Sequence, residues 1–272
     1  MTALSINGGG VPTIRDLSFL ADLPTLQQFG VFGLDPGDSL DPILWLSGLR
    51  RLVLPPTKGI ALDLPRLTAL ESCSMFWDDG LASVLECSQL RELELVNYPD
   101  NDATRLSKLG RLEVLVLQTP KLRSFNGCAG LASLRDLTVK HSRVLTTIRG
   151  IESCARLERL TLNLCGKLID IDAVALCPNL NYFHAECGRL PSLRPLARSP
   201  KLADVSLTGR YFDVADGDLT PLVAVRSLPW AKLQITPWHP HLRPTQSELF
   251  QMFQSRDLET KGPYEHPPAH SG

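Results

Sequence analysis

The sequence predicts an α/β solenoid, in which short strands stack into one parallel concave sheet and short helical or extended turns form the convex side. Two observations support this prediction: an apolar motif, Leu-x-x-Leu-x-Leu, recurs along the chain, and its copies start at nearly constant intervals. The clearest copies are "LRRLVL" from Leu49, "LRELEL" from Leu90, "LEVLVL" from Leu112, "LRDLTV" from Leu134 and "LERLTL" from Leu157. A fixed period of this length is typical of repeat architectures.

Weaker copies fill the gaps between the clear ones and start at Leu26, Leu67, Leu180 and Leu202. The interval from Leu49 to Leu67 is shorter than the others, which are all about 22 residues long. Leu4 and Ile6 fit the strand positions of a further repeat that starts at Met1. The sequence therefore begins inside a repeat, so either an uncapped first strand offers its edge for pairing or a longer natural protein continues upstream.

The period and the Leu-x-x-Leu-x-Leu core resemble the leucine-rich repeat family. The stretch "LNYFHAECGRLPSLRPLARSP" is most similar to its short (about 22-residue) bacterial, internalin-like class, where apolar residues continue through a tight convex turn. This resemblance covers roughly residues 1–235 and implies a horseshoe whose concave face carries the function. A less specific resemblance, of "DGDLTPL" from Asp216 and the segment after it, implies the terminal part of a stand-alone cytosolic protein of this family.

The chain divides into three predicted segments. Residues 1–235 form the leucine-rich repeat solenoid, residues 236–257 form a C-terminal cap with a helix, and residues 258–272, rich in Pro, Gly and charge, form a disordered tail. Thr245 and Glu248 have the spacing of a capping box at the start of the cap helix. Four residues predict an apolar face on that helix: Leu249, Phe250, Met252 and Phe253.

The seven cysteines fit a packing role better than a chemical one. Cys87, Cys154 and Cys177 each stand three residues before a motif start, where other repeats have leucine, so this position is predicted to be a buried apolar site. Cys154 and Cys177 lie on adjacent repeats, so an incidental disulfide between them under oxidation stays open. The odd number of cysteines and the absence of any C-x-x-C predict neither a disulfide framework nor a zinc ribbon.

The sequence has no motif typical of a P-loop, a serine hydrolase or a zinc protease, and "DVADGD" departs from the spacing of an EF-hand loop. We interpret "NGGGVPT" as a turn and "DVADGD" as a loop. His239 and His241 form an H-x-H pair that leaves only adventitious metal binding open, and His266 and His270 lie in the predicted tail. We therefore expect no catalytic residue, no metal and no cofactor, and a protein that is not an enzyme.

The outward-facing strand positions form the candidate site. Residues 3, 5 and 7 of each motif are predicted to face the concave side, where side chains can vary over a fixed ladder. Six acidic residues (Glu71, Glu92, Glu94, Asp136, Glu186, Asp204) and three basic ones (Arg51, Lys140, Arg159) give a net charge of −3, which disfavours nucleic acid. The candidate partner-binding residues are Glu71, Glu92, Glu94, Val96, Val114, Val116, Asp136, Thr138, Lys140, Arg159, Thr161, Tyr182, His184 and Glu186.

Two zones of this face differ from a plain solvated surface. The first zone combines an apolar spot with like charges that repel one another, and it comprises Val96, Val114 and Val116 with Glu71, Glu92 and Glu94. The second zone has the composition of interface hot spots, and it comprises Lys140, Arg159, Tyr182, His184 and Glu186. For either zone the alternative is an ordinary strand surface, with valine present for its β-propensity and charges that are merely solvated.

These features predict a cytoplasmic scaffold that binds a protein partner of unidentified class through its concave face, without nucleic acid or membrane. A chain of 272 residues with 43% apolar residues and a net charge of −1 is typical of a soluble globular protein. Neither a secretion signal nor an apolar run of spanning length occurs in the sequence. The alternative is a secreted or surface-exposed internalin-like adhesin or effector, which the seven apparently unpaired cysteines and the absent signal disfavour.

Overall fold

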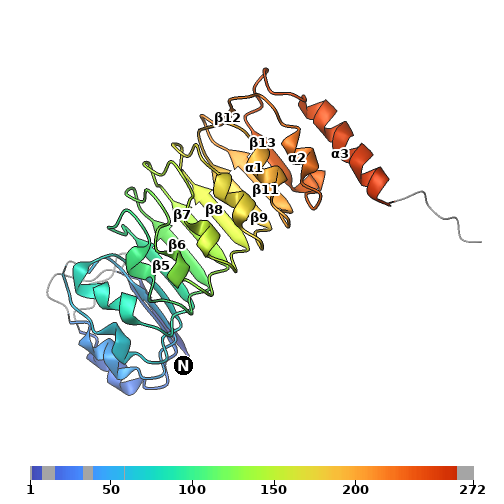
Figure 1. Ribbon diagram of the computed structural model, residues 1–272. Helices are drawn as coiled ribbons and strands as arrows, with labels where there is room; N and C mark the ends of the chain where they lie inside the picture. The colour runs from blue at the N-terminus through green and yellow to red at the C-terminus, as the bar shows by residue number, and fades with distance from the viewer. Residues whose placement is uncertain (1, 8–15, 33–38, 58, 262–272) are drawn as a thin grey trace, which may run out of the picture.

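The computed structural model describes residues 2–7, 16–32, 39–57 and 59–261, and it is a solenoid built on one long parallel sheet (Figure 1). Within these residues the sheet has 11 strands that follow one another in chain order. They are β1 (Ala3–Asn7), β2 (Gln28–Phe32), β3 (Arg51–Leu54), β4 (Ser72–Phe76), β5 (Glu92–Val96), β6 (Val114–Gln118), β7 (Asp136–Lys140), β8 (Arg159–Asn163), β9 (Tyr182–Glu186), β11 (Asp204–Thr208) and β13 (Leu233–Thr236). Most of the glycine-rich stretch "NGGGVPT" lies outside the described residues.

Short helical turns return the chain from each strand to the next and form the convex side. Repeats of about 22 residues leave room for only a turn or two of helix beside each strand. The turns are η1 (Ser18–Asp22), η2 (Asp41–Trp45), η3 (Leu64–Arg66), η4 (Asp79–Glu86), η5 (Thr104–Leu106), η6 (Cys128–Gly130), η7 (Ile151–Ser153), η8 (Asp172–Leu176), α1 (Arg194–Ala197) and α2 (Pro221–Ala224). A further short turn, η9 (Trp230–Lys232), leads directly into β13. A second small sheet pairs β10 (Arg189–Leu190) with β12 (Asp213–Val214). This architecture confirms the predicted α/β leucine-rich repeat solenoid.

The core is a ladder of apolar side chains from paired strands. Leu93, Leu115, Leu137 and Leu160 are register partners on β5 to β8, and each is at most 1% exposed. Because side chains alternate along a strand, these leucines face inward and their sequence neighbours face the concave side. Full burial of one leucine contributes roughly 1.5–3 kcal/mol, so the ladder accounts for much of the stability. The predicted register of these repeats is therefore correct.

The first repeat also has the predicted register, because Leu4 pairs with Phe29 and Ile6 with Val31. The repeat predicted to start at Leu67 is wrong by three residues. Cys73 and Met75 are the buried residues of β4, so this repeat starts at Leu70. Cys73 was expected on the concave face and is buried instead. The motif was misplaced because Cys73 and Met75 stand where the neighbouring repeats have leucine.

A C-terminal helix, α3 (Gln246–Lys261), closes the end of the solenoid opposite the N-terminus (Figure 1). The predicted capping box is present, since the Glu248 carboxylate accepts the Thr245 N–H at 2.8 Å and Thr245 Oγ1 accepts the Glu248 N–H at 3.4 Å. The helix extends to Lys261, so the boundary predicted at residue 257 is too early. Residues 262–272 of the predicted tail lie outside the described residues.

The cap helix is anchored by two buried side chains and one arginine. Leu249 and Phe253 are fully buried, and the Phe253 ring centroid lies 5.7 Å from that of Trp230. Arg256 donates hydrogen bonds of 2.7 to 3.2 Å to the carbonyls of Val223, Val225 and Leu228, which close the last repeat. Two of the four expected apolar-face residues, Phe250 (38%) and Met252 (37%), are exposed, so the buried face is narrower than predicted.

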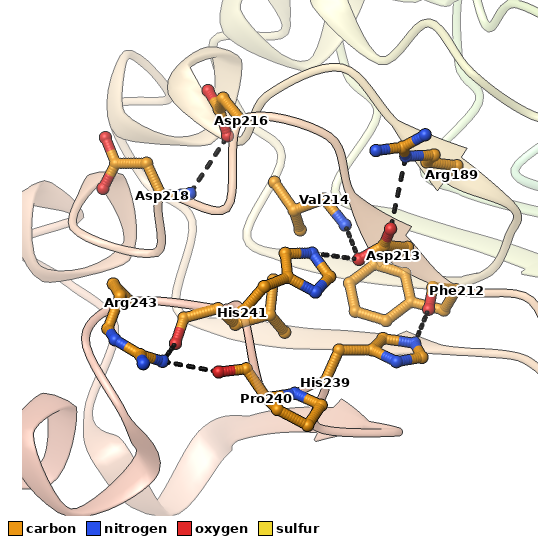
Figure 2. Close-up of polar contacts among 11 residues, drawn as sticks. Arg189, Phe212, Asp213, Val214, Asp216, Asp218, His239, Pro240, His241 and Arg243 are labelled. Carbon is orange, nitrogen blue, oxygen red and sulfur yellow. Dashed lines mark hydrogen bonds and ion pairs between the residues drawn. The ribbon is translucent and has the colours of Figure 1, made fainter.

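Two histidines tie the segment before α3 to the last repeat (Figure 2). His239 Nε2 lies 2.8 Å from the Phe212 carbonyl oxygen, and His241 Nε2 lies 2.9 Å from Oδ1 of Asp213. Asp213 also pairs with Arg189 at 3.2 Å, and Figure 2 shows its carboxylate between the Arg189 and His241 side chains. Asp213 opens "DVADGD" within β12, so only part of this stretch is a loop. His239 and His241 thus attach the segment before α3 to the last repeat, as Figure 2 shows.

The described residues hold neither a metal-binding cluster nor a membrane-spanning helix. They contain no group of three or more His, Cys, Asp or Glu side chains arranged to hold a metal ion. His266 and His270 lie outside them. No helix within them combines the length and apolar character that crossing a bilayer requires.

Candidate functional site on the concave face

The concave face presents three parallel rows of side chains, because every second residue of an in-register strand faces the same side. The first row, from β5 to β11, is Glu92, Val114, Asp136, Arg159, Tyr182 and Asp204. The second row is Glu94, Val116, Thr138, Thr161, His184 and Ser206. The third row is Val96, Gln118, Lys140 and Asn163, continued on β9 by Glu186. All predicted site residues except Glu71 lie on these rows.

Glu71 lies outside the rows, because the repeat that holds it starts at Leu70. It precedes β4 by one residue, and its carboxylate pairs with Arg50 at 3.0 Å. Lys232, which lies beside Asp204 just before β13, joins the face instead. Five acidic residues (Glu92, Glu94, Asp136, Glu186, Asp204) then stand against four basic ones (Arg51, Lys140, Arg159, Lys232). The concave face is therefore close to neutral rather than at −3.

The glutamates of the first zone repel one another less than the sequence suggests, because Glu92 and Glu94 both have partners. Glu94 Oε1 lies 3.7 Å from Lys140 Nζ, and its other oxygen accepts a hydrogen bond of 3.0 Å from Ser74. Glu92 accepts a hydrogen bond of 3.0 Å from Ser72. Because β6 separates β5 from β7, the Lys140 side chain must cross the valine-bearing strand to reach Glu94. Lys140, assigned to the second zone from sequence, thus links the two zones.

Three residues of the second zone, Arg159, Tyr182 and His184, belong to a continuous series of side-chain contacts. The series crosses four strands of the sheet, from β7 to β11, and ends at Lys232 just before β13. Arg159 pairs with Asp136 at 3.3 Å, and its guanidinium carbon lies 3.7 Å from the centroid of the Tyr182 ring. The Tyr182 ring stacks on His184, with centroids 3.8 Å apart, and the Tyr182 hydroxyl lies 2.7 Å from His184 Nδ1. The other ring nitrogen of His184, Nε2, lies 2.8 Å from Asp204, which lies 3.6 Å from Lys232 Nζ. We call this set (Asp136, Arg159, Tyr182, His184, Asp204, Lys232) the aromatic–ionic chain.

Within the aromatic–ionic chain, burial and the charge of Arg159 have opposite effects on the pKa values of Asp136 and Tyr182. Partial burial raises the pKa of the Asp136 carboxyl, and the adjacent Arg159 guanidinium only partly offsets this. Burial likewise raises the pKa of the Tyr182 hydroxyl, against the lowering effect of Arg159. Burial thus outweighs the Arg159 charge at Asp136, so an added hydrogen-bond donor would stabilise the charged form of this carboxyl.

Glu186, the remaining residue of the predicted second zone, stands apart from this chain, because its carboxylate accepts the Leu164 N–H at 3.0 Å. Sequence reasoning did not assign Asp204 and Lys232 to the zone. Lys232 precedes the inward-facing Leu233 as Asp204 precedes the buried Val205. Aligning these two strands would have placed Lys232 in the same row as Asp204. Lys232 was missed because strand positions 3, 5 and 7 were assigned only as far as the repeat that starts at Leu202.

All seven cysteines are free and buried, which confirms the packing role predicted for Cys87, Cys154 and Cys177 and corrects the concave position expected for Cys73. Burial raises the pKa of Cys165 to about 11, and it raises the pKa to about 12 for Cys73, Cys87, Cys177 and Cys187. A side-chain hydrogen bond with Cys154 raises the pKa of Cys128. Cys154 and Cys177, the pair for which a disulfide was left open, are both free. None of these sites has the exposed, electropositive surroundings that make a thiol nucleophilic.

Burial of the thiols has a direct chemical test. We expect all seven cysteines of the folded protein to react with the thiol reagent DTNB at least about a hundredfold more slowly than in guanidinium chloride, because reaction requires local opening. The absorbance of the released thionitrobenzoate measures the reaction rate in both conditions. One thiol that reacts rapidly in the native protein would disprove the packing assignment for its site.

Neither protein-family models nor curated proteins match the chain. Solved structures do match. An internalin from Listeria monocytogenes is 20% identical, and the match covers 80% of this chain and 63% of that chain with a TM-score of 0.60. A leucine-rich repeat protein from Leptospira interrogans is 16% identical, with 88% and 62% covered and a TM-score of 0.59. The chain thus spans less than two thirds of either structure, and these likenesses show its fold: a leucine-rich repeat solenoid.

Two further solved structures with a similar fold are complexes. The mouse RP105/MD-1 complex is 20% identical, with 89% of this chain and 48% of that chain covered and a TM-score of 0.59. The TLR13–ssRNA13 complex is 16% identical, with 86% and 40% covered and a TM-score of 0.55. Since one of these complexes contains RNA, the exclusion of nucleic acid predicted from the concave charge is not supported by the fold. The fold does not by itself exclude catalysis either.

Proposed function

We propose that this protein is a non-catalytic module that binds a protein partner through the concave face of its solenoid. Leucine-rich repeat neighbours of similar fold support a protein-interaction module in general, among them a chain solved as a protein complex. The aromatic–ionic chain carries the assignment to the concave face. Tyr and Arg are the side chains most enriched at interface hot spots, and here Tyr182 and Arg159 are stacked on each other.

The geometry of the aromatic–ionic chain favours binding because its side chains are already held in place. Each side chain from Asp136 to Lys232 is held by its neighbours, so little side-chain freedom remains to be lost when a partner docks. The residues are half-exposed or exposed, so their upper faces stay available to the partner. The Asp136 carboxyl, where burial outweighs the Arg159 charge, adds a preference for a hydrogen-bond donor. The proposed partner surface therefore places an apolar group over the Tyr182 ring and a donor beside Asp136.

The experiment is capture of protein partners from the native cell by the immobilised chain and by matched variants. We expect Tyr182→Ala to reduce recovery of the partner by about thirtyfold, since loss of a hot-spot side chain costs about 2 kcal/mol or more. Tyr182→Phe keeps the ring and removes the hydroxyl near His184, so a smaller loss is expected. Trp45→Ala, which removes an aromatic side chain that is 51% exposed on convex η2, is the matched control and should retain binding. Equal capture by Tyr182→Ala and the unchanged protein would refute the second zone.

The first zone is tested by a separate variant. Glu94→Lys combined with Val116→Arg should abolish capture, because it replaces an apolar and acidic surface with two cations beside Lys140. Both residues face the concave side, so the thermal melting temperature should stay nearly unchanged. Unaltered capture would remove the first zone from the interface and leave the second zone as the docking site.

We also propose that the protein works in the cytoplasm. Seven free thiols are typical of a reducing compartment, whereas an extracellular protein of this size would tend to pair them. The alternative, a secreted or surface-exposed adhesin, predicts protein outside the cell. Fractionation of the native cell followed by immunodetection separates the two, and protein found in the medium or on the cell surface would overturn the cytoplasmic assignment.

A further inference from the structure

The two long edges of the solenoid differ in how their charges are compensated. Along the edge where the strands begin, cations and carboxylates alternate on neighbouring repeats and pair with each other. The pairs are Arg50 with Glu71, Arg91 with Glu113, and Arg135 with Glu158. Each exposed pair contributes little to stability, but together they leave this edge nearly neutral.

The opposite edge, where the strands end, is basic and uncompensated. Loops that leave β6, β7, β8 and β11 carry exposed lysines and arginines close to the strand ends. We call this set the basic edge, and it comprises Lys121, Arg123, Arg143, Lys167 and Arg210. Within the part of the chain that the structure describes, none of the five forms an ion pair with an acidic side chain. Three acidic residues lie near these cations and are engaged elsewhere. Asp100, which lines a hollow with Lys121 and Arg123, pairs with Arg105, and Asp213 pairs with Arg189. Glu186, which lines a hollow with Arg143 and Arg210, accepts the Leu164 N–H.

These cations are close enough to act together. Neighbouring strands of a sheet lie about 4.8 Å apart, and charges at physiological salt are screened over about 8 Å. Cations on successive loops therefore repel one another and raise the local positive potential, which a bound anion would relieve. The paired charges on the edge where the strands begin show that this fold accommodates alternating charge. The fold itself therefore does not require that the five cations of the basic edge lack acidic partners.

The basic edge also contains hollows and exposed apolar side chains. A hollow of about 400 Å³ is lined by Pro99, Pro120, Lys121 and Arg123 among others, and a second of about 280 Å³ by Arg143, Leu164, Arg210 and Tyr211 among others. Leu164 is 47% exposed and Tyr211 is 69% exposed. Leu164 adopts a left-handed backbone conformation with φ of +55°, which leucine rarely adopts, and core burial does not compensate for it.

From this arrangement we propose that the basic edge is a second docking surface, which binds an acidic, extended segment of a protein partner. The uncompensated cations supply the charge complementarity, and Leu164 and Tyr211 supply apolar contacts between them. The inference goes beyond the proposed function, because it concerns a surface separate from the concave face. A polypeptide in which acidic and apolar side chains alternate fits better than a nucleic acid. Its carboxylates can lie beside the cations and away from the Glu186 carboxylate that lines the second hollow, whereas a continuous phosphate backbone would carry charge past it.

The size of the segment follows from the spacing of the repeats. Loops from β6 to β11 belong to five successive strands of the sheet, so the basic edge extends over about 20 Å. An extended polypeptide advances about 3.3 Å per residue, so a segment of roughly six residues spans the edge. Alternate side chains of such a segment would face the cations, and the others would face Leu164 and Tyr211.

The test uses fluorescence anisotropy with the full chain and three labelled probes. The first probe is a peptide of about twelve residues in which Glu alternates with Phe and Leu, the second has Lys in place of Glu, and the third is oligouridylate. The edge variant combines Lys121→Glu, Arg143→Glu, Lys167→Glu and Arg210→Glu. The matched control combines Arg66→Glu, Arg156→Glu, Arg198→Glu and Arg226→Glu, which makes the same charge change at exposed arginines outside the basic edge. Tyr182→Ala reports separately on the concave face.

The acidic peptide should bind the unchanged protein, the matched control and Tyr182→Ala within about twofold of one another, and the edge variant about thirtyfold more weakly. The Lys peptide should not bind. If the edge variant unfolds, Arg143→Glu alone should still weaken binding about threefold. The proposal fails if the acidic peptide does not bind or if the matched control weakens it equally. Tighter, edge-dependent binding of oligouridylate would assign the surface to nucleic acid instead. A loss confined to Tyr182→Ala would assign binding to the concave face.

Discussion

Leu160→Ala should lower the free energy of unfolding by about 2 to 5 kcal/mol, the range expected when a fully buried leucine is truncated. Leu160 is fully buried on β8 between Leu137 on β7 and Phe183 on β9. The hydrogen-bonded strands on both sides fix the backbone, so the neighbouring repeats cannot collapse into the cavity. Urea unfolding followed by circular dichroism measures the loss, and Leu115→Ala, the equivalent change on β6, should give a loss in the same range.

Thr161→Ala is the matched control for this prediction. Thr161 follows Leu160 in the same strand, but it is half-exposed on the concave face. Its truncation should change the free energy of unfolding by no more than about 0.5 kcal/mol. If Leu160→Ala were harmless, or if the two substitutions had equal effects, the alternation of inward and outward residues described for β8 would be wrong.

Gly150→Ala should destabilise the protein by about 2 to 4 kcal/mol through backbone strain and a steric clash. Gly150, just before η7, has a φ of +106°, which an alanine rarely adopts. A Cβ atom there would lie 2.5 Å from the backbone carbonyl of Phe125 in the preceding repeat. Because a backbone atom cannot move aside as a flexible side chain can, the two repeats would have to separate. Thermal and urea unfolding both report the change.

Gly166→Ala provides the comparison, since a Cβ atom at Gly166 would meet nothing within 4 Å and its φ is not positive. That substitution should be neutral or slightly stabilising, because alanine restricts the unfolded chain more than glycine does. A loss for Gly150→Ala no greater than the change for Gly166→Ala would mean that adjacent repeats are not in close backbone contact at η7.

The sequence predicts most of the fold because the buried leucines of paired strands repeat at a nearly fixed interval. Leu93, Leu115, Leu137 and Leu160 were placed correctly since each belongs to a motif whose apolar positions are clear. The prediction failed at β4, where Cys73 and Met75 fill the strand positions. Apolar residues other than leucine fill the same volume, and a leucine pattern alone does not detect them.

The candidate site was predicted as a surface but not as a set of contacts. Alternation along each strand places Asp136, Arg159 and Tyr182 in one row, yet it says nothing of the stacking of Arg159 on Tyr182, which depends on side-chain rotamers. Lys232 was missed because the concave positions were assigned only as far as the repeat that starts at Leu202. The basic edge was missed because only strand positions 3, 5 and 7 were read as functional, whereas these cations lie in loops beyond the motif.

Site-specific photo-crosslinking in the native cell tests most directly the proposal that the concave face binds a protein partner. A photoreactive phenylalanine analogue would replace Thr161, on the concave face beside the aromatic–ionic chain, or Leu176, which is 65% exposed on convex η8. Docking on the concave face should give a heavier protein adduct from position 161 and none from position 176. An adduct from position 176 with none from position 161 would contradict it.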